Sequence, residues 1–498
     1  MIDEAVSLSR PRATAQFLRD EAADSRTFLD KRVLLTGEKT VLATQNGKDC
    51  FLDSLLLLVR ITPNLTVVLP EDPFLAATAR GIIEQLEHPN KVVFVSDTDF
   101  TEYQAILSIG CNSEANLPLT TINSNGWLVR VCSRGFSISS ECSEANPVGA
   151  LAASSLGVSE VFKRLIALKP ERGELVTKLE FSFYSYATSD SPGPRIPASL
   201  PIDLFLVGVG AIGNGIVHLL RSINVSGSLL VIDKQEYMEE NLGTCLLMGS
   251  RDVGKSKALF AQELLANKLN VTPFNESVTG FVPKLGVDFP YPWLVLNAVD
   301  NIEARRQVQL LWPDMIIDGA IGELACEVTL HPWGENLSCL LCDFEEPGVG
   351  AEEIQSKLTG LRKSRLGDQE SLVSDEDISC APTEKKDWLG SQLGRPICSV
   401  ISNATTDRIS QEKQNEGFRP SVPFVACLSA CMVIGELLRY LSREPQVLES
   451  GFQFDVLSGP LGGRCKAHGR KHSCICVQRA DNIALLRKKR GLGRSQYV

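Results

Sequence analysis

An α/β fold made of two similar halves in tandem is predicted by three features of this 498-residue sequence. Short runs rich in Val, Leu and Ile alternate with helix-like segments, which is typical of a mainly parallel sheet covered by helices on both faces. A glycine-rich segment at residues 208–213 directly follows one such run. Two long apolar helices are expected as well, one after Pro147 and one after Pro423.

The composition is that of an ordinary globular protein. Hydrophobic residues make up 44% of the chain and charged residues 22%, and the length predicts two to four domains. A net charge of −10 and a pI near 5.3 disfavour a nucleic-acid-binding surface along the whole chain. The N-terminus shows no secretory signal, and the longest apolar stretch, residues 422–438, is short for a bilayer span. We therefore expect a cytoplasmic protein without nucleic-acid or membrane partners.

The first alternating unit is expected over residues 31–188, after a polar and partly helical arm at residues 1–30. Its expected strands are residues 32–35, 65–70, 91–96 and 127–132, with residues 40–44 forming a hairpin with the first of them. Its expected helices are residues 50–60, 74–88 and 150–168. Residues 189–201 hold four prolines without hydrophobic periodicity and predict a linker.

The second unit is expected over residues 202–345 plus 420–480. Its expected strands are residues 203–210, 228–233, 293–298 and 315–318, and its expected helices are 211–224, 255–269 and 424–442. Residues 346–419 are charged and Ser-rich, which indicates an inserted region with helical pieces. Residues 481–498 are expected to form a basic, frayed tail.

An internal repeat is indicated by the two apolar helices. In each of them an acidic and a basic residue follow the leading proline by 13 and 16 positions. The residues concerned are Glu160 and Lys163 after Pro147, and Glu436 and Arg439 after Pro423. The repeat favours a diverged tandem pair of α/β units.

A nucleotide site is predicted at the start of the second unit. Gly208, Gly210 and Gly213 fit the G-x-G-x-x-G pattern, between an expected strand and an expected helix. Glycines let the backbone approach a phosphate, and the N-terminus of the helix presents free N–H groups to it. Asp233 follows 20 residues later at the end of the next strand, where a carboxylate can accept hydrogen bonds from ribose hydroxyls. The matching strand exit of the first unit is expected at residues 44–48, whose single glycine predicts that nucleotide binding has been lost there.

The residues after the glycine loop do not follow a dehydrogenase pattern. The distinctive stretches are Asn241-Leu242, the segment 252–258 (DVGKSKA), Val299-Asp300-Asn301 and Ala304-Arg305-Arg306. Together these residues resemble the ubiquitin-activating enzyme superfamily, which includes the adenylyltransferases of thiamine and molybdopterin synthesis. The resemblance covers about residues 203–345, with further echoes at 395–478. It implies two Rossmann-like units of the ThiF type, the first degenerate and the second active.

The resemblance implies that the chain adenylates a protein. Enzymes of this superfamily use ATP and Mg²⁺, and the C-terminal glycine carboxylate of a ubiquitin-like protein attacks the α-phosphorus. By motif match, Lys257 contacts phosphate, Asp300 holds Mg²⁺, Asn241 lines the phosphate site and Asp233 holds the ribose. Arg305 is either a further catalytic cation or a member of an ion pair on the helix surface. Each residue alone also has an ordinary structural explanation, so the combination carries the prediction.

One position departs from the superfamily pattern. An Arg usually stands three residues after this Asn, and the chain has Thr244 there. Arg251 or Lys255 is a candidate replacement for the missing cation. The superfamily also takes an arginine from its partner subunit or inactive half, and Arg10 or Arg12 is a candidate for that role. The resemblance implies a pseudo-dimer within one chain, and a homodimer remains open.

A structural zinc site is predicted by two of the closely spaced cysteine pairs. The chain has 15 cysteines, and close pairs without a secretory signal suggest metal ligands or reactive thiols. Four thiolates make a closed tetrahedral Zn²⁺ site, and the superfamily often carries a zinc on two such pairs. The pairs are Cys339 with Cys342 and Cys474 with Cys476. The second pair is C-x-C rather than C-x-x-C, so Cys465 or His468 is an alternative fourth ligand.

A thioester-forming cysteine is implied because conjugating members of the superfamily move the acyl group onto sulfur. Cys398 is favoured, since its segment resembles the superfamily's Cys-Thr segment, precedes an expected helix and has Arg395 nearby, which favours a thiolate. Cys380 is the alternative, although its acidic surroundings are expected to raise the pKa of its thiol. A third alternative is that neither cysteine reacts.

The leading prediction is an activating enzyme for a ubiquitin-like protein, resembling the bacterial members of such conjugation systems and passing its product to a conjugating enzyme. One rival is a sulfur-carrier adenylyltransferase of cofactor synthesis, which needs no thioester. A second rival is a non-catalytic binding subunit, which Thr244 keeps open.

Overall fold

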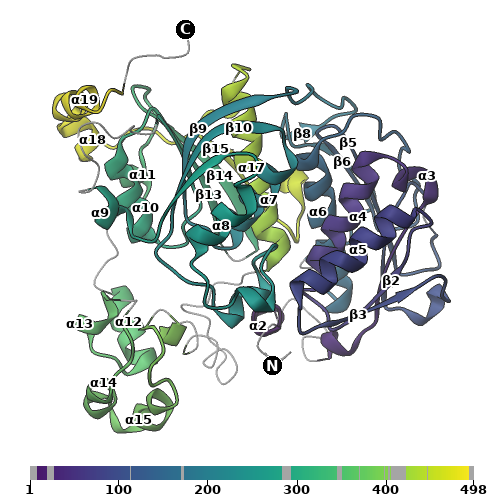
Figure 1. Cartoon of the computed structure of the whole chain (residues 1–498), viewed down its shortest axis with the longest axis horizontal. Helices are drawn as coiled ribbons and strands as arrows, with labels where there is room; N and C mark the ends of the chain where they lie inside the picture. Colours follow the sequence, from purple (N-terminus) through teal and green to yellow (C-terminus); the bar gives the residue numbers. More distant parts are fainter. Residues whose placement is uncertain are drawn as a thin grey trace.

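The computed structural model describes residues 8–18, 27–112, 114–169, 173–282, 293–322, 324–344, 350–368, 371–397, 399–401, 404, 422–445 and 447–492. Within these ranges the chain forms two eight-stranded sheets side by side, with helices between and around them (Figure 1).

The first sheet has the strand order β3-β2-β1-β4-β5-β6-β7-β8. The strands from β3 to β5 are parallel, and β6, β7 and β8 continue the sheet in antiparallel pairs. The strands are β1 Val33–Gly37, β2 Asn64–Val68, β3 Lys91–Val95, β4 Ala105–Ile109, β5 Leu119–Asn125, β6 Leu128–Cys132, β7 Leu179–Ser182 and β8 Ala187–Thr188.

The second sheet repeats this order strand by strand, as β11-β10-β9-β12-β13-β14-β15-β16. The parallel and antiparallel pairings fall at the same places. The strands are β9 Leu200–Val207, β10 Val225–Ile232, β11 Asn270–Phe274, β12 Leu294–Asn297, β13 Met315–Gly322, β14 Ala325–Pro332, β15 Gly451–Asp455 and β16 Arg464–Lys466. The predicted fold class, two Rossmann-like α/β units in tandem, is therefore confirmed.

Helices of the two units correspond as well. They are α4 Gln45–Leu58, α5 Pro73–Leu86 and α6 Pro147–Leu165 in the first unit, and α7 Ala211–Ser222, α8 Lys257–Leu265 and α17 Pro423–Leu441 in the second. The helices α6 and α17 pack against each other between the sheets (Figure 1). Among the described helices, α17 has the length and apolarity of a membrane span, and its burial in this core accounts for that apolarity.

Buried ion pairs mark the same place in α6 and α17. The Lys163 Nζ lies 2.6 Å from Glu160 Oε1, and the Arg439 Nε lies 3.6 Å from Glu436 Oε2. Tyr186, beyond β7, donates a hydrogen bond of 2.8 Å to Glu436 and so ties the first unit to the central helix of the second. Isolated charges would be costly in this core, so each helix carries its own counterion.

The units differ most in the connection that leads from the sixth strand of the sheet to the long apolar helix. In the first unit, residues 133–146 join β6 to α6, whereas residues 333–422 join β14 to α17. The longer connection contains α11 Leu340–Asp343, α12 Gly350–Thr359, α13 Lys363–Leu366, α14 Asp375–Cys380 and α15 Thr383–Gly390. The helices α12 to α15 lie away from the sheets in Figure 1 and surround a small core of their own.

Four sequence expectations differ from the structure. Residues 39–42 form the short helix α3 (Lys39–Leu42) rather than the second strand of a hairpin. The first strand therefore leaves the sheet at Gly37 and Glu38, and the expected exit at residues 44–48 is instead the start of α4. The expected frayed tail forms α19 (Ala480–Lys489), where Ile483 and Arg487 are buried. The strands not predicted are β4, β5, β7, β8, β11, β14, β15 and β16, most of which are short or polar and lack a clear hydrophobic pattern.

Candidate nucleotide site and cysteine cluster

The glycine loop follows β9 and leads directly into α7. Gly208 has φ +90°, and a Cβ there would lie 2.8 Å from the Ala298 carbonyl oxygen. A Cβ at Gly213 would lie 2.2 Å from the carbonyl oxygen of Gly208, so both positions require glycine. Gly210 is the N-cap of α7 and provides no side-chain cap. The first N–H groups of α7 therefore remain available to an anion.

Asp233 follows β10 at the same edge of the sheet. Its Oδ2 accepts a hydrogen bond of 2.7 Å from the Val209 N–H, and its Oδ1 accepts one of 2.8 Å from the Gln235 N–H. The half-buried carboxylate thus holds the glycine loop in place. Each carboxylate oxygen has a second lone pair, so a ribose hydroxyl can still donate to it.

Lys257 is the first residue of α8 and is almost fully buried. Its Nζ donates a hydrogen bond of 2.8 Å to Gln235 Oε1 and lies 5.6 Å from the centre of the Tyr237 ring. No carboxylate pairs with this ammonium group in the described part of the chain. The arrangement keeps a buried positive charge whose counterion can come from a ligand. Gln235 was not among the predicted site residues, because its role depends on Lys257 lying beside it.

A second unpredicted link joins the glycine loop to the segment 244–250. Asn214 on α7 donates to the Val209 carbonyl at 3.2 Å and to the Tyr237 hydroxyl at 2.5 Å, and its Oδ1 accepts from the Leu247 N–H at 3.0 Å. The Tyr237 hydroxyl lies 3.0 Å from the same Val209 carbonyl. Asn214 is completely buried, so these hydrogen bonds fix the two segments against each other.

Asn241 and Thr244 lie in the 3-10 turn η5 (Glu239–Gly243) and just after it. Asn241 Oδ1 accepts a hydrogen bond of 2.9 Å from the Met238 N–H, which explains why an Asn suits this turn. Thr244 is buried. Of the two candidate replacements for a cation here, Lys255 is paired with Asp252 at 3.0 Å and also contacts Glu263, while Arg251 is exposed.

Asp300 and Arg305 follow β12 and have different surroundings. Asp300 is exposed and accepts a hydrogen bond of 3.2 Å from Asn301 Nδ2, which leaves its carboxylate open to a cation. Arg305 is buried, forms an ion pair with Asp318, and donates 2.7 Å to the Val299 carbonyl. Arg305 therefore does form an ion pair, as one alternative predicted, but it is buried rather than on the helix surface, and it joins the turn after β12 to the middle of β13. Burial raises the pKa of Asp318, and the Arg305 guanidinium opposes that rise.

The two predicted cysteine pairs come together in the structure. The sulfur of Cys339 lies 3.7 Å from those of Cys342 and Cys474, and the sulfurs of Cys342 and Cys476 are 3.5 Å apart. All four lie within 4.8 Å of one another. A tetrahedral zinc with bonds of about 2.3 Å would hold its sulfurs about 3.8 Å apart, so the four thiols have the spacing of such a site. Cys465 is exposed on β16, outside this cluster.

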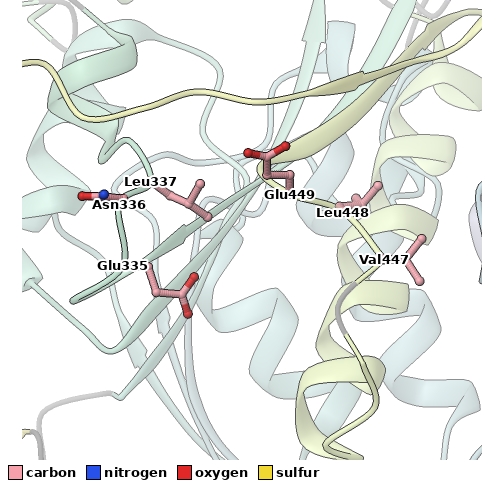
Figure 2. A pocket seen from close by; sticks show the side chains of 6 residues that line it. All are labelled: Glu335, Asn336, Leu337, Val447, Leu448 and Glu449. Atoms are coloured by element: carbon pink, nitrogen blue, oxygen red, sulfur yellow. The ribbon is translucent and has the colours of Figure 1, made fainter.

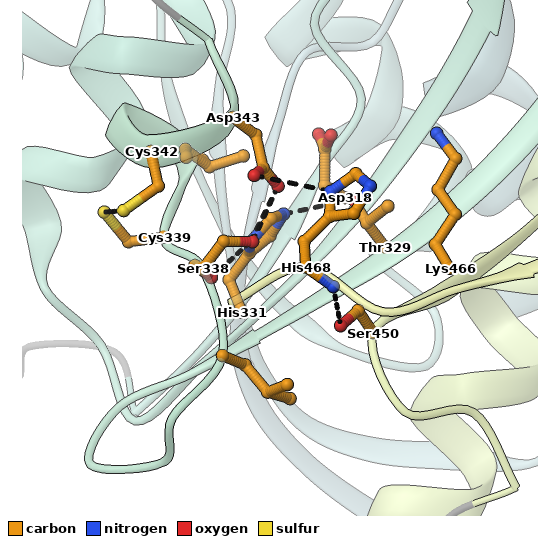
Figure 3. Close-up of polar contacts among 12 residues, drawn as sticks. Asp318, Thr329, His331, Ser338, Cys339, Cys342, Asp343, Ser450, Lys466 and His468 are labelled. Carbon is orange, nitrogen blue, oxygen red and sulfur yellow. Dashed lines mark hydrogen bonds and ion pairs between the residues drawn. The ribbon is translucent and has the colours of Figure 1, made fainter. Parts of the chain in front are cut away.

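The loop that carries the first pair is fastened by a buried polar network (Figure 3). His331 Nδ1 lies 2.9 Å from the Ser338 carbonyl and its Nε2 lies 3.0 Å from the Thr329 hydroxyl. The carbonyl can only accept, so Nδ1 carries the proton. Ser338 donates 2.8 Å to Asp343, and His468 Nδ1 lies 3.4 Å from the same carboxylate. His468 therefore supports the loop and does not belong to the four-sulfur cluster.

Crowding and burial affect the thiols of the cluster. Burial raises the pKa of the Cys476 thiol to about 12, and burial together with the neighbouring sulfurs also raises the pKa of Cys339. A bound cation would reverse this effect by favouring the thiolates. The Lys471 N–H donates to the Cys342 sulfur at 3.4 Å, a contact suited to a thiolate ligand.

The cluster and the glycine loop lie at opposite edges of the second sheet. Trp312 and Trp333 pack in one apolar cluster with the cysteines. Trp312 precedes β13 and Trp333 follows β14, so the cluster lies at the end of the sheet where β13 begins. A hollow of about 460 Å³ opens at the edge that carries the cysteine cluster (Figure 2). The hollow is lined by Glu335, Asn336, Leu337, Val447, Leu448 and Glu449. The glycine loop instead follows the carboxyl ends of the parallel strands, where ligands bind in such sheets.

The remaining predicted residues are the two candidate thioester cysteines and the two arginines of the N-terminal arm. Cys398 lies outside the described residues, between the buried Ile397 and Ser399. Cys380 is exposed at the last position of α14. The arm helix α2 (Ser9–Phe17) contacts η5, which brings the arm to the candidate site; Arg12 is exposed there, and the side chain of Arg10 lies outside the description.

Comparisons with known proteins identify one family model and several similar proteins. The family model that matches the chain is that of the ThiF family, over residues 201–476. An uncharacterized protein, y4jF of Sinorhizobium fredii, is 25% identical over 508 residues, covering 96% of this chain and 95% of its own. The catalytic subunit of the NEDD8-activating enzyme E1 of Dictyostelium discoideum is 28% identical over 149 residues, covering 29% of this chain and 33% of its own. The crystal structure of E. coli MccB aligns over 55% of this chain and 64% of its own, with 15% identity and a TM-score of 0.35.

Proposed function

The chain belongs to the ThiF family, and we propose that its second unit uses ATP and Mg²⁺ to adenylate the C-terminal glycine of a ubiquitin-like protein. The observation that carries the proposal is the set of groups at the carboxyl edge of the second sheet. The uncapped N-terminus of α7 follows β9, the buried Lys257 ammonium is hydrogen-bonded to Gln235 just after β10, and the exposed Asp300 carboxylate follows β12. These three strands are neighbours in the sheet.

The reaction joins two anions, and the site is built to offset their repulsion. A carboxylate oxygen forms a bond to the α-phosphorus, the bond from that phosphorus to the bridging oxygen breaks, and pyrophosphate leaves. The N–H groups of α7 and the Lys257 ammonium supply fixed positive charge on the protein side. A bound Mg²⁺ would neutralise further phosphate charge. Asp300, exposed after β12, is the residue that would hold it.

Three further residues have separate proposed roles. Asp233 positions the glycine loop through the Val209 N–H and would accept from the ribose. Arg305 is proposed as a positioning residue, because it donates to the carbonyl of Val299, the residue before Asp300, and to the carbonyl of Gly319 in the neighbouring strand β13. Asn241 would line the phosphate site from η5.

We also propose that the acyl group then moves to a cysteine of the inserted region. The thiol loses its proton, its sulfur bonds to the acyl carbon, and the bond from that carbon to AMP breaks. Cys398 is favoured on its sequence, and Cys380 is the alternative because it is exposed on α14. The small independent core of the inserted region supports a separate role for it. A downstream conjugating enzyme would take the product.

The Cys339 cluster is proposed to hold one structural Zn²⁺. Its four sulfurs have the spacing of a closed tetrahedral site, and the cluster lies at the edge of the sheet away from the glycine loop. It would fasten α18 (Ile475–Gln478) and α19 to the second sheet, together with Arg487, which donates to the Trp312 and Pro313 carbonyls.

The test is to mix the full chain with ATP, Mg²⁺ and a candidate ubiquitin-like protein. Pyrophosphate exchange measures adenylation, and intact mass without reductant detects a thioester. We expect exchange in the native chain and its loss in Lys257→Ala and Asp300→Ala. We expect an adduct that reductant removes and that Cys398→Ala abolishes, with Cys380→Ser as the matched control.

The other outcomes assign the rivals. Exchange without an adduct would identify an adenylyltransferase that needs no thioester, such as a sulfur-carrier enzyme. An adduct lost only in Cys380→Ser would move the thioester to that residue. ATP binding without exchange, across a panel of ubiquitin-like partners, would identify a binding subunit.

A further inference from the structure

A buried arginine of the first unit donates hydrogen bonds to backbone carbonyls of the second unit, beside the candidate nucleotide site. Arg60 follows α4 and is completely buried. Its Nε donates 2.9 Å to the Cys245 carbonyl and its Nη2 donates 2.8 Å to the Met248 carbonyl, both in the second unit. Its Nη1 donates 2.8 Å to the Leu56 carbonyl of its own helix. In the described part of the chain, all its hydrogen bonds therefore go to carbonyl oxygens.

The same segment of the second unit is held at further points by residues 86–88. His88 Nε2 lies 3.4 Å from the Leu242 carbonyl, and the Ser250 hydroxyl donates to the Glu87 carbonyl. A Cβ at Gly249 would lie 2.3 Å from the Leu86 carbonyl oxygen, so the two backbones are in close contact. The first unit thus holds both ends and the middle of the segment 242–250.

This segment is joined directly to the glycine loop. Its Leu247 N–H donates to Asn214 Oδ1, and the Asn214 amide donates to the Val209 carbonyl of the loop. A displacement of the segment would therefore remove hydrogen bonds that hold the turn over the N-terminus of α7. Asn241 directly precedes this segment in η5 and would move with it.

A buried arginine is energetically unfavourable for a contact that only holds two backbones together. Burial of a cation among neutral groups is unfavourable, and it lowers the pKa of Arg60 to about 10. The guanidinium nonetheless remains charged near neutral pH. Its planar fork can hold two carbonyls of one loop at fixed directions, which no apolar residue of similar size can do.

We propose that Arg60 is a positioning residue through which the first unit sets the affinity of the second unit for ATP. The inference rests on the proposed function, because it assumes that the glycine loop binds the nucleotide. It assigns the first unit a task other than chemistry, namely holding the segment 242–250 in the arrangement that the glycine loop requires.

The test compares Arg60→Ala with Arg130→Ala in the full chain. Arg130 is also a buried arginine that donates to a backbone carbonyl, that of Glu141, but this contact stays within the first unit. Calorimetric titration with ATP gives the affinity, and thermal melting gives the stability. We expect both variants to lose stability, and only Arg60→Ala to bind ATP about tenfold more weakly per folded molecule.

Two further variants keep the inference falsifiable if Arg60→Ala does not fold. Arg60→Lys retains the charge but not the fork, and Gly249→Ala retains Arg60 but pushes the segment away from Leu86. Each should weaken ATP binding severalfold. Native affinity in every folded variant of this set would overturn the inference. Absence of ATP binding in the native chain would instead overturn the proposed function itself.

Discussion

The two units share one sheet topology but differ at the point where β1 and β9 leave the sheet. The pairing of Gly37 with Ile109 and of Val207 with Asn297 places Glu38 where the second unit has Gly208. The Glu38 carboxylate accepts hydrogen bonds of 2.9 Å and 2.7 Å from the N–H groups of Cys111 and Asn112. A carboxylate of the protein thus occupies backbone N–H groups at the carboxyl ends of the parallel strands, where sheets of this kind have their ligand crevice.

The helices that follow differ in the same sense. The helix α4, which corresponds to α7, starts after the short helix α3 and has Thr44 as its N-cap, whose hydroxyl accepts from the Gly47 N–H at 3.0 Å. The start of α7 has only Gly210, with no side chain to cap it. One unit satisfies its helix terminus internally, and the other leaves it for a ligand.

The strands beside the crevice differ as well. The second unit has Asn297 at the end of β12 and Asp318 beside it in the middle of β13, with a hydrogen bond of 2.6 Å between them. The matching residues of the first unit are Ile109 and Ile122. The comparison teaches that a few side chains at one edge of a sheet separate a nucleotide site from a scaffold of the same topology.

The largest expected effect tests a feature that the second unit alone has among the described residues, the four-cysteine cluster. Cys476→Ser should remove the metal and lower the free energy of unfolding by about 4 kcal/mol or more, because metal binding contributes to folding. Metal analysis and thermal melting with and without chelator measure this. Cys465→Ser, outside the cluster, should retain both metal and stability; equal behaviour of the two variants would contradict a metal site.

Alanine substitutions at two glycines of the loop should have different consequences. Gly213→Ala places a Cβ against the Gly208 carbonyl and should weaken ATP binding about 30-fold, or about 2 kcal/mol, with a lower melting temperature. Gly210→Ala places its Cβ in open space and should leave the melting temperature unchanged. Titration calorimetry measures the ATP affinity of each variant, and thermal melting measures its stability. A stable Gly213→Ala chain with native affinity would refute the proposed use of this loop.

The filled crevice of the first unit can be opened at Glu38. Glu38→Ala leaves two backbone N–H groups without their acceptor and should cost about 1–2 kcal/mol in chemical denaturation. Glu102→Ala, which removes an exposed ion pair with Arg32, should cost less than about 1 kcal/mol. Binding of ATP at a second site in Glu38→Ala would show that this side chain alone blocks the first unit; we expect none, because Thr44 still caps α4.

The smallest expected effect is a pH dependence where the units meet. Burial and the nearby Asp53 raise the pKa of Asp49 to about 6, and Asp53 itself lies 2.7 Å from His218 on α7. The folded state therefore holds the Asp49 proton more tightly than the unfolded chain does. This stabilisation is present below about pH 4 and is lost as the pH rises through about 6.

Asp49→Asn should consequently stabilise the chain at pH 8 relative to the native protein, with a smaller gain at pH 5. Melting curves at the two pH values measure the difference. Glu84→Gln, which changes an exposed carboxylate on α5, is the control and should show no such pH dependence. An equal gain of Asp49→Asn at both pH values would mean that the carboxyl does not titrate in this range.

Much of the fold could be predicted because its signals are local. The apolar runs of β9, β10 and β12 and the long helices α6 and α17 are recorded in consecutive residues. The polar strand β5 escaped prediction because its Thr, Ser and Asn side chains are buried by the tertiary structure. The exit of β1 was misplaced because a single glycine in residues 44–48 looked like a turn, whereas Glu38 carries no turn signal.

The sequence by itself determined the strand–turn–helix of the glycine loop, the internal repeat and the two cysteine pairs, because each depends on residues a few positions apart. Only the tertiary structure decided that the C-x-C pair joins the C-x-x-C pair, that Arg305 is buried, and that Arg60 holds the segment 242–250. These contacts join residues separated by up to 188 positions in the chain. Their formation depends on how the two sheets pack against α6 and α17, which no local spacing records.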